Sequence, residues 1–480
     1  MKRFLIGLWL SWFVCGCVYA QDLTVKYNEF RKSALQKYSS FRDECNQTYA
    51  EFLRNAWEWY EGKNPLPIPK EENPVPPQPY QPIDKNPVSV EPKPVKPIEL
   101  TPQPKPIEPI RENSLSNDYF NVKFYGVSAK IRLPNSVKNI LNGISEDDIA
   151  NAWEIMSSGV LDNAIRDCLE ARILFNLCDW AYIQFLAELA EQFCTDENCA
   201  TLLTAYLFCQ SGYKMRLAKD NGTLVLLFAS KQFIYNKPYF IIDAETLYPF
   251  KEVSTGLKIS NISFKGETPL SMNIGKEQLI GIKTTEPRKI SSNRYKDMIA
   301  SCQVPAEILS FHNTYPTSAE NGNHLTRWSI YANTPLSKGT KEKLYADLSK
   351  AISGLSKTEA ADKLLNWVQT GFEYEYDDKI WGYDRAFFAE ETLFYPYCDC
   401  EDRSILFSRL VRDLLGLEVA LIYYPGHLAT AVKFEEDVVG DAMIINGNRY
   451  IICDPTYIGA PIGKQMPNLQ HNKAEAVILD

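Results

Sequence analysis

Aromatic side chains recur with a helical period near the start of the chain. Tyrosines stand 11 residues apart from Tyr27 to Tyr60, phenylalanines follow three residues later, and small residues four residues after those. Steps of 3, 4 and 4 residues average about 3.67 per turn, close to a straight α-helix. Residues 21–63 are therefore predicted to form one amphipathic helix, with Arg42 off its aromatic face. The helix either docks on its own domain or associates with a partner, a second copy included.

The composition changes abruptly after this repeat. Prolines stand at nearly every second or third position between Pro65 and Pro109. Proline fixes φ and removes a backbone donor, so residues 64–117 are predicted to form neither helix nor sheet. We expect a semi-rigid polyproline II spacer between the N-terminal helix and the rest of the protein.

The middle of the chain mixes helical and strand patterns. Apolar residues between Ile149 and Cys194 recur with a helical period, and short strands are predicted at Gly222–Ala229 and Pro238–Asp243. Residues 118–260 are interpreted as one mixed module. Residues 261–340 are interpreted as a connecting, β-rich region.

The pattern near the C-terminus places three chemically active side chains at element ends. Apolar residues after Cys400 form a helical stripe that Gly416 closes, so the thiol lies at a predicted helix N-terminus. The helix macrodipole there is expected to lower the thiol pKa. After a strand through Tyr424 and a Pro-Gly turn, His427 begins a second strand, and Asp454 directly follows a third. A nucleophile, a base and a residue that orients the base are the groups that nucleophilic catalysis needs.

This order of motifs resembles the transglutaminase-like core of the papain-like superfamily. The family pattern is Cys-x-Asp-x-Ala/Ser, then Gly-His, then Asp-Pro-Thr; the matching segments are Cys400–Ser404, Gly426–His427 and Asp454–Thr456. The resemblance implies an α+β catalytic domain at residues 341–480, with the cysteine-bearing helix packed on an antiparallel sheet. It also implies a catalytic triad of Cys400, His427 and Asp454, without cofactor or metal.

The resemblance further implies attack of the Cys400 thiolate on a carboxamide or peptide carbonyl, which gives a thioester. The backbone N–H of Cys400 is the expected first oxyanion donor, and Tyr397 and Trp381 are candidates for the second. Asp399 and Ala429 depart from the family pattern at positions that border the substrate groove, so specificity does not carry over. A zinc site is the rival interpretation; it would use Cys398, Cys400, His427 and Cys453.

A weaker copy of the same pattern lies 204 residues earlier. In an ungapped comparison Gly212 and Gly222 match Gly416 and Gly426, while Asp196 and Thr223 stand at the positions of Cys400 and His427. A later segment, Tyr239–Asp243, is aligned with Tyr450–Asp454. We interpret residues 118–260 as a degenerate transglutaminase-like module without a nucleophile or a base. A different strand order in the two segments would contradict this interpretation.

The start of the chain and its charge indicate compartment and partners. Residues 1–20 have a basic start, an apolar stretch and a Val-Tyr-Ala end, which is typical of a cleaved signal peptide. We therefore expect an exported protein, periplasmic or extracellular, with membrane association only if Cys17 is lipidated. A net charge of -9 argues against nucleic acid as a partner. Some of the ten cysteines beyond Ala20 are free to pair in an oxidising compartment.

Three functions remain open from the sequence. The leading one is an exported cysteine peptidase or amidase that hydrolyses a peptide or protein substrate. The second is a protein-glutamine acyl transferase with the same triad, in which an amine resolves the thioester. The third is a cell-envelope binding protein without enzymatic activity.

Overall fold

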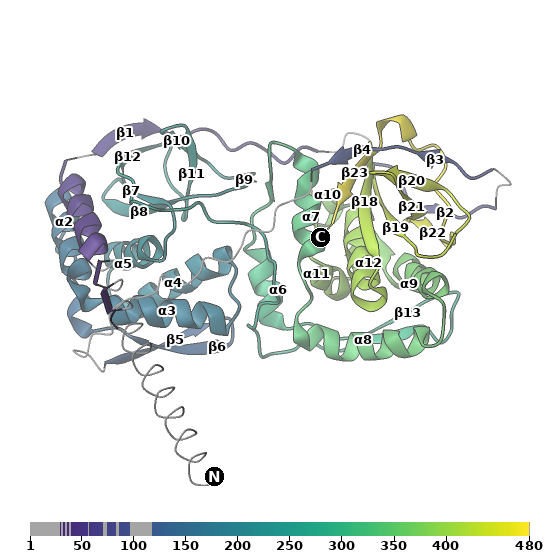
Figure 1. Cartoon of the computed structure of the whole chain (residues 1–480), viewed down its shortest axis with the longest axis horizontal. Coiled ribbons are helices and arrows are strands. Elements are labelled where there is room, and N and C mark those ends of the chain that lie inside the picture. Colours follow the sequence, from purple (N-terminus) through teal and green to yellow (C-terminus); the bar gives the residue numbers. More distant parts are fainter. Residues whose placement is uncertain are drawn as a thin grey trace, which may run out of the picture.

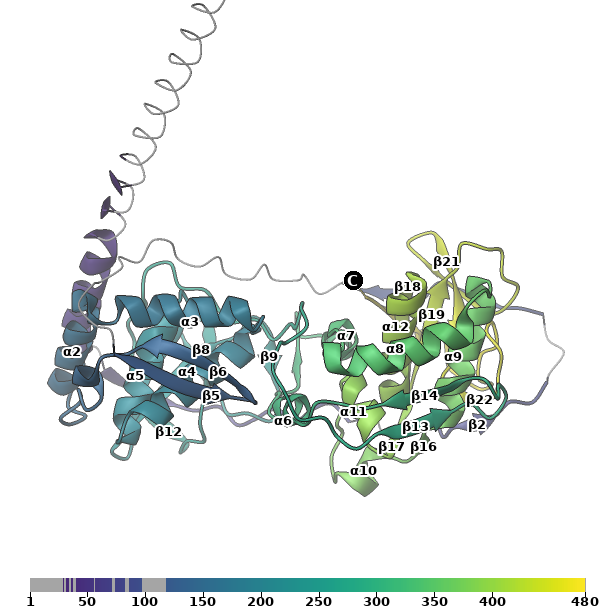
Figure 2. The same ribbon diagram turned by 90° about the horizontal axis from the view of Figure 1, so that it is seen from below.

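The computed structural model describes residues 29, 32–33, 36–37, 40–55, 57–70, 74–82, 86–96 and 118–479. The predicted signal peptide and Cys17 lie outside these residues. The described chain forms two lobes side by side, an N-terminal lobe around residues 118–260 and a C-terminal lobe that ends at residue 479 (Figures 1 and 2). Both lobes are mixed α+β, with curled sheets that are antiparallel except where short edge strands join them. No described helix is both long and apolar enough to span a bilayer.

The N-terminal lobe begins with a hairpin and four helices and ends in a six-stranded sheet. The hairpin consists of β5 (Tyr119–Phe124) and β6 (Val127–Arg132), and the helices are α2 (Glu146–Ile155), α3 (Asp162–Leu174), α4 (Asp179–Phe193) and α5 (Glu197–Gln210). The sheet has the order β1 (Trp57–Glu61), β12 (Gly256–Ser260), β7 (Met215–Asp220), β8 (Thr223–Ala229), β11 (Glu245–Pro249) and β10 (Phe240–Ile242). The predicted strands near 222–229 and 238–243 are thus confirmed as β8 and β10.

The C-terminal lobe packs helices against a seven-stranded sheet. Its helices are α6 (Ala306–Asn313), α7 (Arg327–Asn333), α8 (Lys338–Ile352), α9 (Lys357–Gly371), α10 (Asp377–Ile380), α11 (Ala389–Phe394) and α12 (Cys400–Leu415). The sheet order is β3 (Ser89–Val90), β20 (Ala442–Ile445), β21 (Asn448–Cys453), β19 (His427–Lys433), β18 (Glu418–Tyr424), β23 (Glu475–Ile478) and β4 (Lys93–Val95). The apolar stripe of α12 is buried against β18 and β19, and Gly416 ends the helix in the left-handed conformation, as its sequence predicts.

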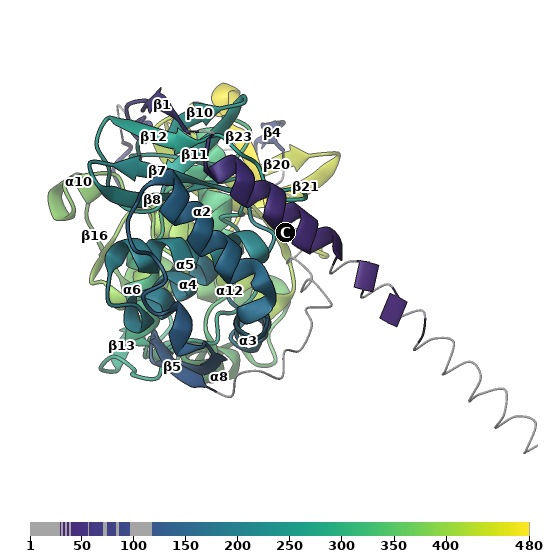
Figure 3. The same ribbon diagram turned by 90° about the vertical axis from the view of Figure 1, so that its left-hand side faces the viewer.

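The N-terminal repeat is helical only in part. Residues 40–53 are helical in the described chain, whereas Tyr60, the last tyrosine of the repeat, lies in strand β1. The helix docks on α2 and its own lobe (Figure 3), because Arg42 forms a buried ion pair with Asp162 at 2.5 Å. Phe41 and Phe52 are exposed instead. The predicted aromatic face is therefore buried only in part. Tyr49 of the repeat is 2% exposed and packs on Trp153, whereas the phenylalanines face outward and Arg42 is buried.

The proline-rich segment is not a free spacer. Its short strands β2 (Gln78–Pro79), β3 and β4 pair in parallel with β22 (Tyr457–Ile458), β20 and β23 of the C-terminal lobe. The prediction that this segment forms no sheet was wrong. Proline is tolerated on an edge strand because its missing N–H faces solvent, and Pro94 lies on such an edge.

Residues 261–340 are not a β-rich connection. They contain the two-stranded pair β13 (Arg288–Ser291) and β14 (Ile299–Cys302), followed by α6 and α7. β14 packs against α8 and α7 packs against α12 (Figure 2). Arg412 of α12 donates to Asn333 at the end of α7 at 2.7 Å. The part from β13 onward therefore belongs to the C-terminal lobe, which begins well before residue 341. Residues 268–281 instead pack on the N-terminal lobe, where the N–H of Leu270 donates to the carbonyl of Ala229 and that of Gly281 to the carbonyl of Tyr125.

The main sheets of the two lobes have the same strand order. In chain order, the main-sheet strands after α5 are β7, β8, β10, β11 and β12, and those after α12 are β18, β19, β20, β21 and β23. In each of these two sets the first strand pairs with the second and with the fifth. The fourth strand of each set pairs with the second and with the third. The hairpin registers also coincide after a shift of 204 residues, since Tyr424 opposite His427 corresponds to Asp220 opposite Thr223.

Candidate active site

The start of α12 presents the Cys400 thiol. Asp399 is the N-cap, and the fully buried Asp402 accepts hydrogen bonds from the backbone N–H of Asp399 at 3.2 Å and of Phe387 at 2.8 Å. Carboxylates in the first turn satisfy N–H groups that a helix leaves unpaired. Asp402, the second acidic position of the motif, therefore fixes the turn from which the thiol projects.

His427 and Asp454 form a buried hydrogen-bonded pair. His427 begins β19 directly after Gly426, whose φ of 80° suits glycine in this tight turn. Its Nε2 lies 2.9 Å from Oδ2 of Asp454, which follows the last residue of β21. The other oxygen of Asp454, Oδ1, accepts the backbone N–H of Thr456 at 2.9 Å. The imidazole is thus oriented by a carboxylate that is itself held in place.

Gln369 of α9 fixes the loop that carries Asp454. Its buried Nε2 donates to the backbone carbonyls of Asp454, Tyr457 and Ala460 at 2.9–3.1 Å. Its Oε1 accepts the N–H of Gly459 at 3.1 Å. One side chain from a helix distant in sequence therefore sets the position of the loop that orients the imidazole.

Cys400 and His427 line one cleft. Leu428, the residue after His427, lines the same cleft. Nδ1 of His427 is buried and has no hydrogen-bond partner among the described residues. Because Nε2 is engaged by Asp454, Nδ1 is the nitrogen left to take a proton. The three residues that the sequence indicates are therefore brought to one place by α12, β19 and β21.

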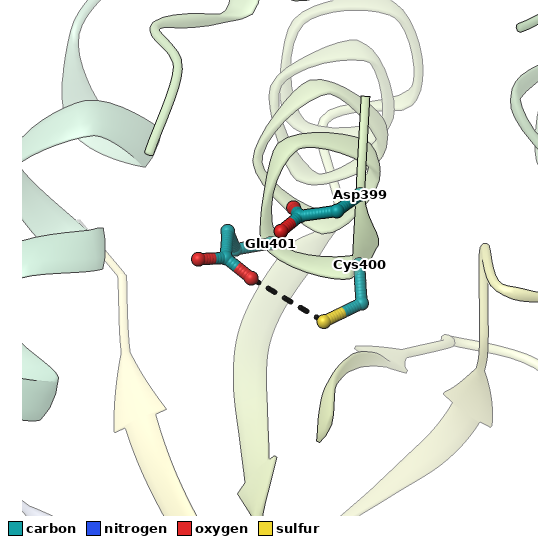
Figure 4. Close-up of side chains that lie close together, drawn as sticks. All are labelled: Asp399, Cys400 and Glu401. Carbon is teal, nitrogen blue, oxygen red and sulfur yellow. Dashed lines mark hydrogen bonds between the residues drawn. The ribbon is translucent and has the colours of Figure 1, made fainter. Parts of the chain in front are cut away.

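The electrostatics of the thiol differ from the expectation. Burial, then the Glu401 carboxylate and then that of Asp399 raise the pKa of Cys400 well above its usual range. The sulfur lies 3.3 Å from Oε2 of Glu401 (Figure 4). A helix N-terminus contributes about 0.3–1 kcal/mol, less than one pKa unit, whereas burial shifts a pKa by up to about 3–5 units. The prediction that the macrodipole sets a low thiol pKa was wrong because two neighbouring carboxylates and burial outweigh it.

We expect the ligand-free protein to show this raised pKa in alkylation. The rate constant for Cys400 with iodoacetamide should rise with pH to beyond 9, and at pH 7 should be at least about tenfold below that of glutathione, because only thiolate reacts. Glu401→Gln should accelerate the neutral-pH reaction about three- to tenfold. Alkylation quenched at set times and quantified by peptide mass spectrometry measures both the pH dependence of the rate and the effect of Glu401→Gln.

The exposed Asp437→Asn is the matched control for this experiment and should leave the rate unchanged. A rate that reaches its plateau below pH 8 in the wild type would contradict the expectation, since it would mean that a thiolate is already formed at rest.

Several residues of the cleft carry no local sequence signal. Aromatic rings and carboxylates surround the thiol, and two residues of the proline-rich segment join them: Lys70, Pro74, Trp328, Tyr374, Tyr376, Asp377, Asp378, Asp384, Asp399, Glu401 and Tyr423. The segment is held at this place because the N–H of Val75 donates to the carbonyl of Gly426 at 2.8 Å.

Neither Tyr397 nor Trp381 lines the cleft. The structure thus supports neither residue as the second donor to the oxyanion.

The rival zinc site is not assembled. Among the described residues, the groups of potential metal ligands near Cys400 consist of Asp399, Cys400 and Glu401, and of Asp377, Asp384 and Glu401. The sulfur of Cys398 instead accepts a hydrogen bond from Nε of Arg403 at 3.4 Å, and all ten cysteines beyond Ala20 are unpaired thiols.

The matching position of the N-terminal lobe holds different side chains. A second cleft is lined by Glu197 at the start of α5, Thr223 at the start of β8, and Lys251. The alignment of Tyr239–Asp243 with Tyr450–Asp454 was wrong, because β10 pairs as β20 does and β11 as β21 does. With that register Lys251, which pairs with Glu191 at 2.9 Å and Glu197 at 3.0 Å, stands where Asp454 stands. This cleft has no thiol–imidazole–carboxylate set.

Comparison of the chain with protein-family models, with curated proteins and with solved structures gives no match. The chemistry of the site is therefore argued from its own geometry. A thiol that shares a cleft with an imidazole, one nitrogen of which is held by a carboxylate, is an arrangement able to attack an acyl carbon and to transfer a proton.

Proposed function

We propose that this protein is a cysteine acyl-transfer enzyme of transglutaminase-like architecture, which attacks amide or peptide carbonyls through Cys400. The observation that carries the proposal is the buried pair of His427 and Asp454 on the cleft that Cys400 lines, with Nδ1 of the imidazole free. The order of the three residues and the packing of α12 on an antiparallel sheet support it further.

In the proposed reaction the Cys400 sulfur forms a bond to the acyl carbon while its proton passes to Nδ1 of His427. The imidazolium is stabilised by Asp454, and the backbone N–H of Cys400 at the helix start donates to the developing oxyanion. The C–N bond then breaks, His427 returns the proton to the departing amine, and a thioester remains. Because the thiol is neutral at rest, His427 acts as a general base during attack.

Water or an amine then resolves the thioester, and these two outcomes define the two enzymatic candidates. In both, His427 takes the proton of the attacking molecule and gives it back to the sulfur as the C–S bond breaks. We favour hydrolysis of a peptide or protein substrate, since water needs no acceptor site. Incorporation of an amine into the product would favour the acyl transferase. A binding protein without activity is the third candidate.

We also propose that the N-terminal lobe is a non-catalytic copy of the same architecture. Its main sheet has the strand order of the C-terminal one, and the β7–β8 hairpin has the register of β18–β19 after a shift of 204 residues. The cleft at the matching place, with Thr223 and Lys251, is suited to binding and not to nucleophilic attack.

An acyl-enzyme experiment tests the enzymatic proposal. The purified protein is incubated with 4-nitrophenyl acetate, an activated acyl donor, and then with a panel of peptide amides, and intact-mass spectrometry monitors a thioester on Cys400. The wild type should form the adduct and lose it again, whereas Cys400→Ser should form no thioester and His427→Ala should form it slowly. Acylation of several cysteines at similar rates in the wild type would favour the binding protein.

A further inference from the structure

Carboxylates crowd the cleft beside the Cys400 sulfur. Asp377, Asp384 and Glu401 place carboxylate oxygens within 4.8 Å of one another, and Asp399 and Glu401 do the same with the Cys400 sulfur (Figure 4). These four carboxylates, at the start of α10, on the loop after it, and at the N-cap and first turn of α12, are here named the carboxylate wall.

The positive charges nearby leave most of this wall unpaired. Arg327 approaches Asp384 at 3.4 Å, and Lys70 pairs with Asp378 at 2.6 Å, beside the wall. The guanidinium of Arg385 is turned to Glu391, and only its backbone N–H donates to Asp377, at 2.6 Å. Within the described ranges no ion pair reaches the other three members, Asp377, Asp399 and Glu401. Their mutual repulsion is therefore uncompensated.

Asp399 gives an independent sign of a missing partner. Its side chain lines the cleft, only 8% of the residue is exposed, and Oδ1 is buried without a hydrogen-bond donor among the described residues. A buried carboxylate oxygen without a donor is costly, by about 1–3 kcal/mol or more. Burial and the neighbouring Glu401 also raise the pKa of Asp377 to about 8 and that of Asp399 well above its usual range. The unpaired oxygen and the raised pKa values are typical of a carboxylate site that binds a positively charged hydrogen-bond donor.

We propose that the carboxylate wall binds a primary ammonium group of the substrate beside Cys400, an inference that rests on the proposed acyl-transfer function. An ammonium has three donors on one compact atom, which suits three carboxylates whose oxygens lie within 4.8 Å. The rings of Tyr374 and Tyr376 line the same cleft and offer an apolar surface to an alkyl chain. Calcium also binds clustered carboxylate oxygens and is therefore the rival occupant that the experiments below must separate from an ammonium.

Binding of the ammonium would also prepare the nucleophile. Glu401 and Asp399 hold the Cys400 thiol protonated, so neutralising them lowers the thiol pKa at the moment that substrate arrives. The ammonium has two chemical sources. It is either a lysine side chain next to the amide that is attacked, or the amine acceptor that resolves the thioester.

Charged thiol reagents test the wall without a known substrate. Cys400 is modified with methanethiosulfonates that carry a 2-aminoethyl, an ethyl or a 2-sulfonatoethyl group, and each rate is divided by the rate of the same reagent with glutathione. In the wild type the cationic reagent should exceed the neutral one at least about tenfold. The double variant Asp377→Asn with Asp384→Asn should remove this preference, and Asp437→Asn should keep it. Equal normalised rates in the wild type would overturn the proposal.

A second measurement separates this proposal from the proposed function and identifies the cation. 1,5-Diaminopentane should accelerate acylation of Cys400 by 4-nitrophenyl acetate, whereas calcium chloride at the same concentration should not. Acylation that both amine and calcium leave unchanged would overturn the ammonium site and leave the enzyme proposal intact; a larger effect of calcium would overturn it in favour of a metal. If Cys400 is never acylated, the enzyme proposal fails. The rates with the three methanethiosulfonates then still show whether the carboxylate wall favours a cation.

Peptide substrates then distinguish the two sources of the ammonium. A peptide amide with lysine beside the bond should be cleaved with kcat/KM at least about tenfold above its norleucine counterpart if the ammonium belongs to the acyl donor. Covalent incorporation of 1,5-diaminopentane into the acyl product would assign it to the acceptor. A norleucine peptide processed as fast as the lysine peptide, without incorporation of diamine, would count against the proposal.

Discussion

Asp454→Asn is expected to lower kcat/KM toward 4-nitrophenyl acetate about 10³-fold without unfolding the protein. The two oxygens of Asp454 have separate duties: Oδ2 meets Nε2 of His427, and Oδ1 accepts the N–H of Thr456. An asparagine has one carbonyl oxygen. If that oxygen stays with Thr456, the amide N–H₂ faces Nε2 and forces the imidazole proton to Nδ1, where it blocks proton transfer from the thiol.

The opposite orientation of the asparagine is also unfavourable, because two donors then meet at Thr456. Steady-state kinetics measure the loss, and circular dichroism with thermal unfolding verifies that the fold is kept. Asp437→Asn, which changes the same side chain on the exposed loop after β19, should stay within twofold of the wild type. Activity of Asp454→Asn within tenfold of the wild type would show that the carboxylate does not set the tautomer.

The second large effect is on stability. Arg403→Met should lower the free energy of unfolding by about 3–5 kcal/mol. Arg403 is 1% exposed and donates to the carbonyls of Gln369 at 3.1 Å and Phe372 at 2.9 Å, and to the Cys398 sulfur at 3.4 Å. Its guanidinium lies over the ring of Tyr374. Methionine fills similar volume but leaves two buried carbonyls without donors.

The chain contains a close control for this variant. Arg449 also donates to two backbone carbonyls, those of Val438 at 2.6 Å and Gly440 at 3.0 Å, but its side chain is exposed. Arg449→Met should therefore cost less than about 1 kcal/mol, since water replaces the lost donor. Urea denaturation followed by circular dichroism measures both variants. A similar small cost for the two would mean that burial of Arg403 adds nothing.

The residues of the candidate catalytic motif could be located from sequence because their signals are local. A helical stripe closed by Gly416 places Cys400 at a helix start, and a Pro-Gly turn places His427 at a strand start. The hydrogen bond between His427 and Asp454 follows once the strands that carry them pair in the observed order. What the sequence could not supply is the wall beyond the motif, since Asp377 at the start of α10 and Asp384 on the loop after it have no distinctive pattern.

Two of the wrong predictions share a physical cause, namely contacts between distant segments. Arg42 looks solvent-exposed until Asp162 is placed beside it, and the pair is then buried. The proline-rich segment has no strand pattern of its own, yet an exposed sheet edge supplies the partners that it lacks. The raised pKa of Cys400 has a local cause instead, because burial of the thiol and the carboxylates of its chain neighbours Glu401 and Asp399 outweigh the helix macrodipole.

The strands β3 and β4 impose an order on folding. They close the two edges of the C-terminal sheet through contacts such as Val88 with Asp441 and Lys93 with Glu475, which are 353 and 382 residues apart in the chain. Closing a loop of this length costs conformational entropy before the paired strands stabilise the fold, and contacts between such distant segments slow folding. During synthesis the proline-rich segment emerges long before its partners. Its prolines disfavour pairing elsewhere in the interval, so the sheet around the cleft is completed only after β20 and β23 have been made.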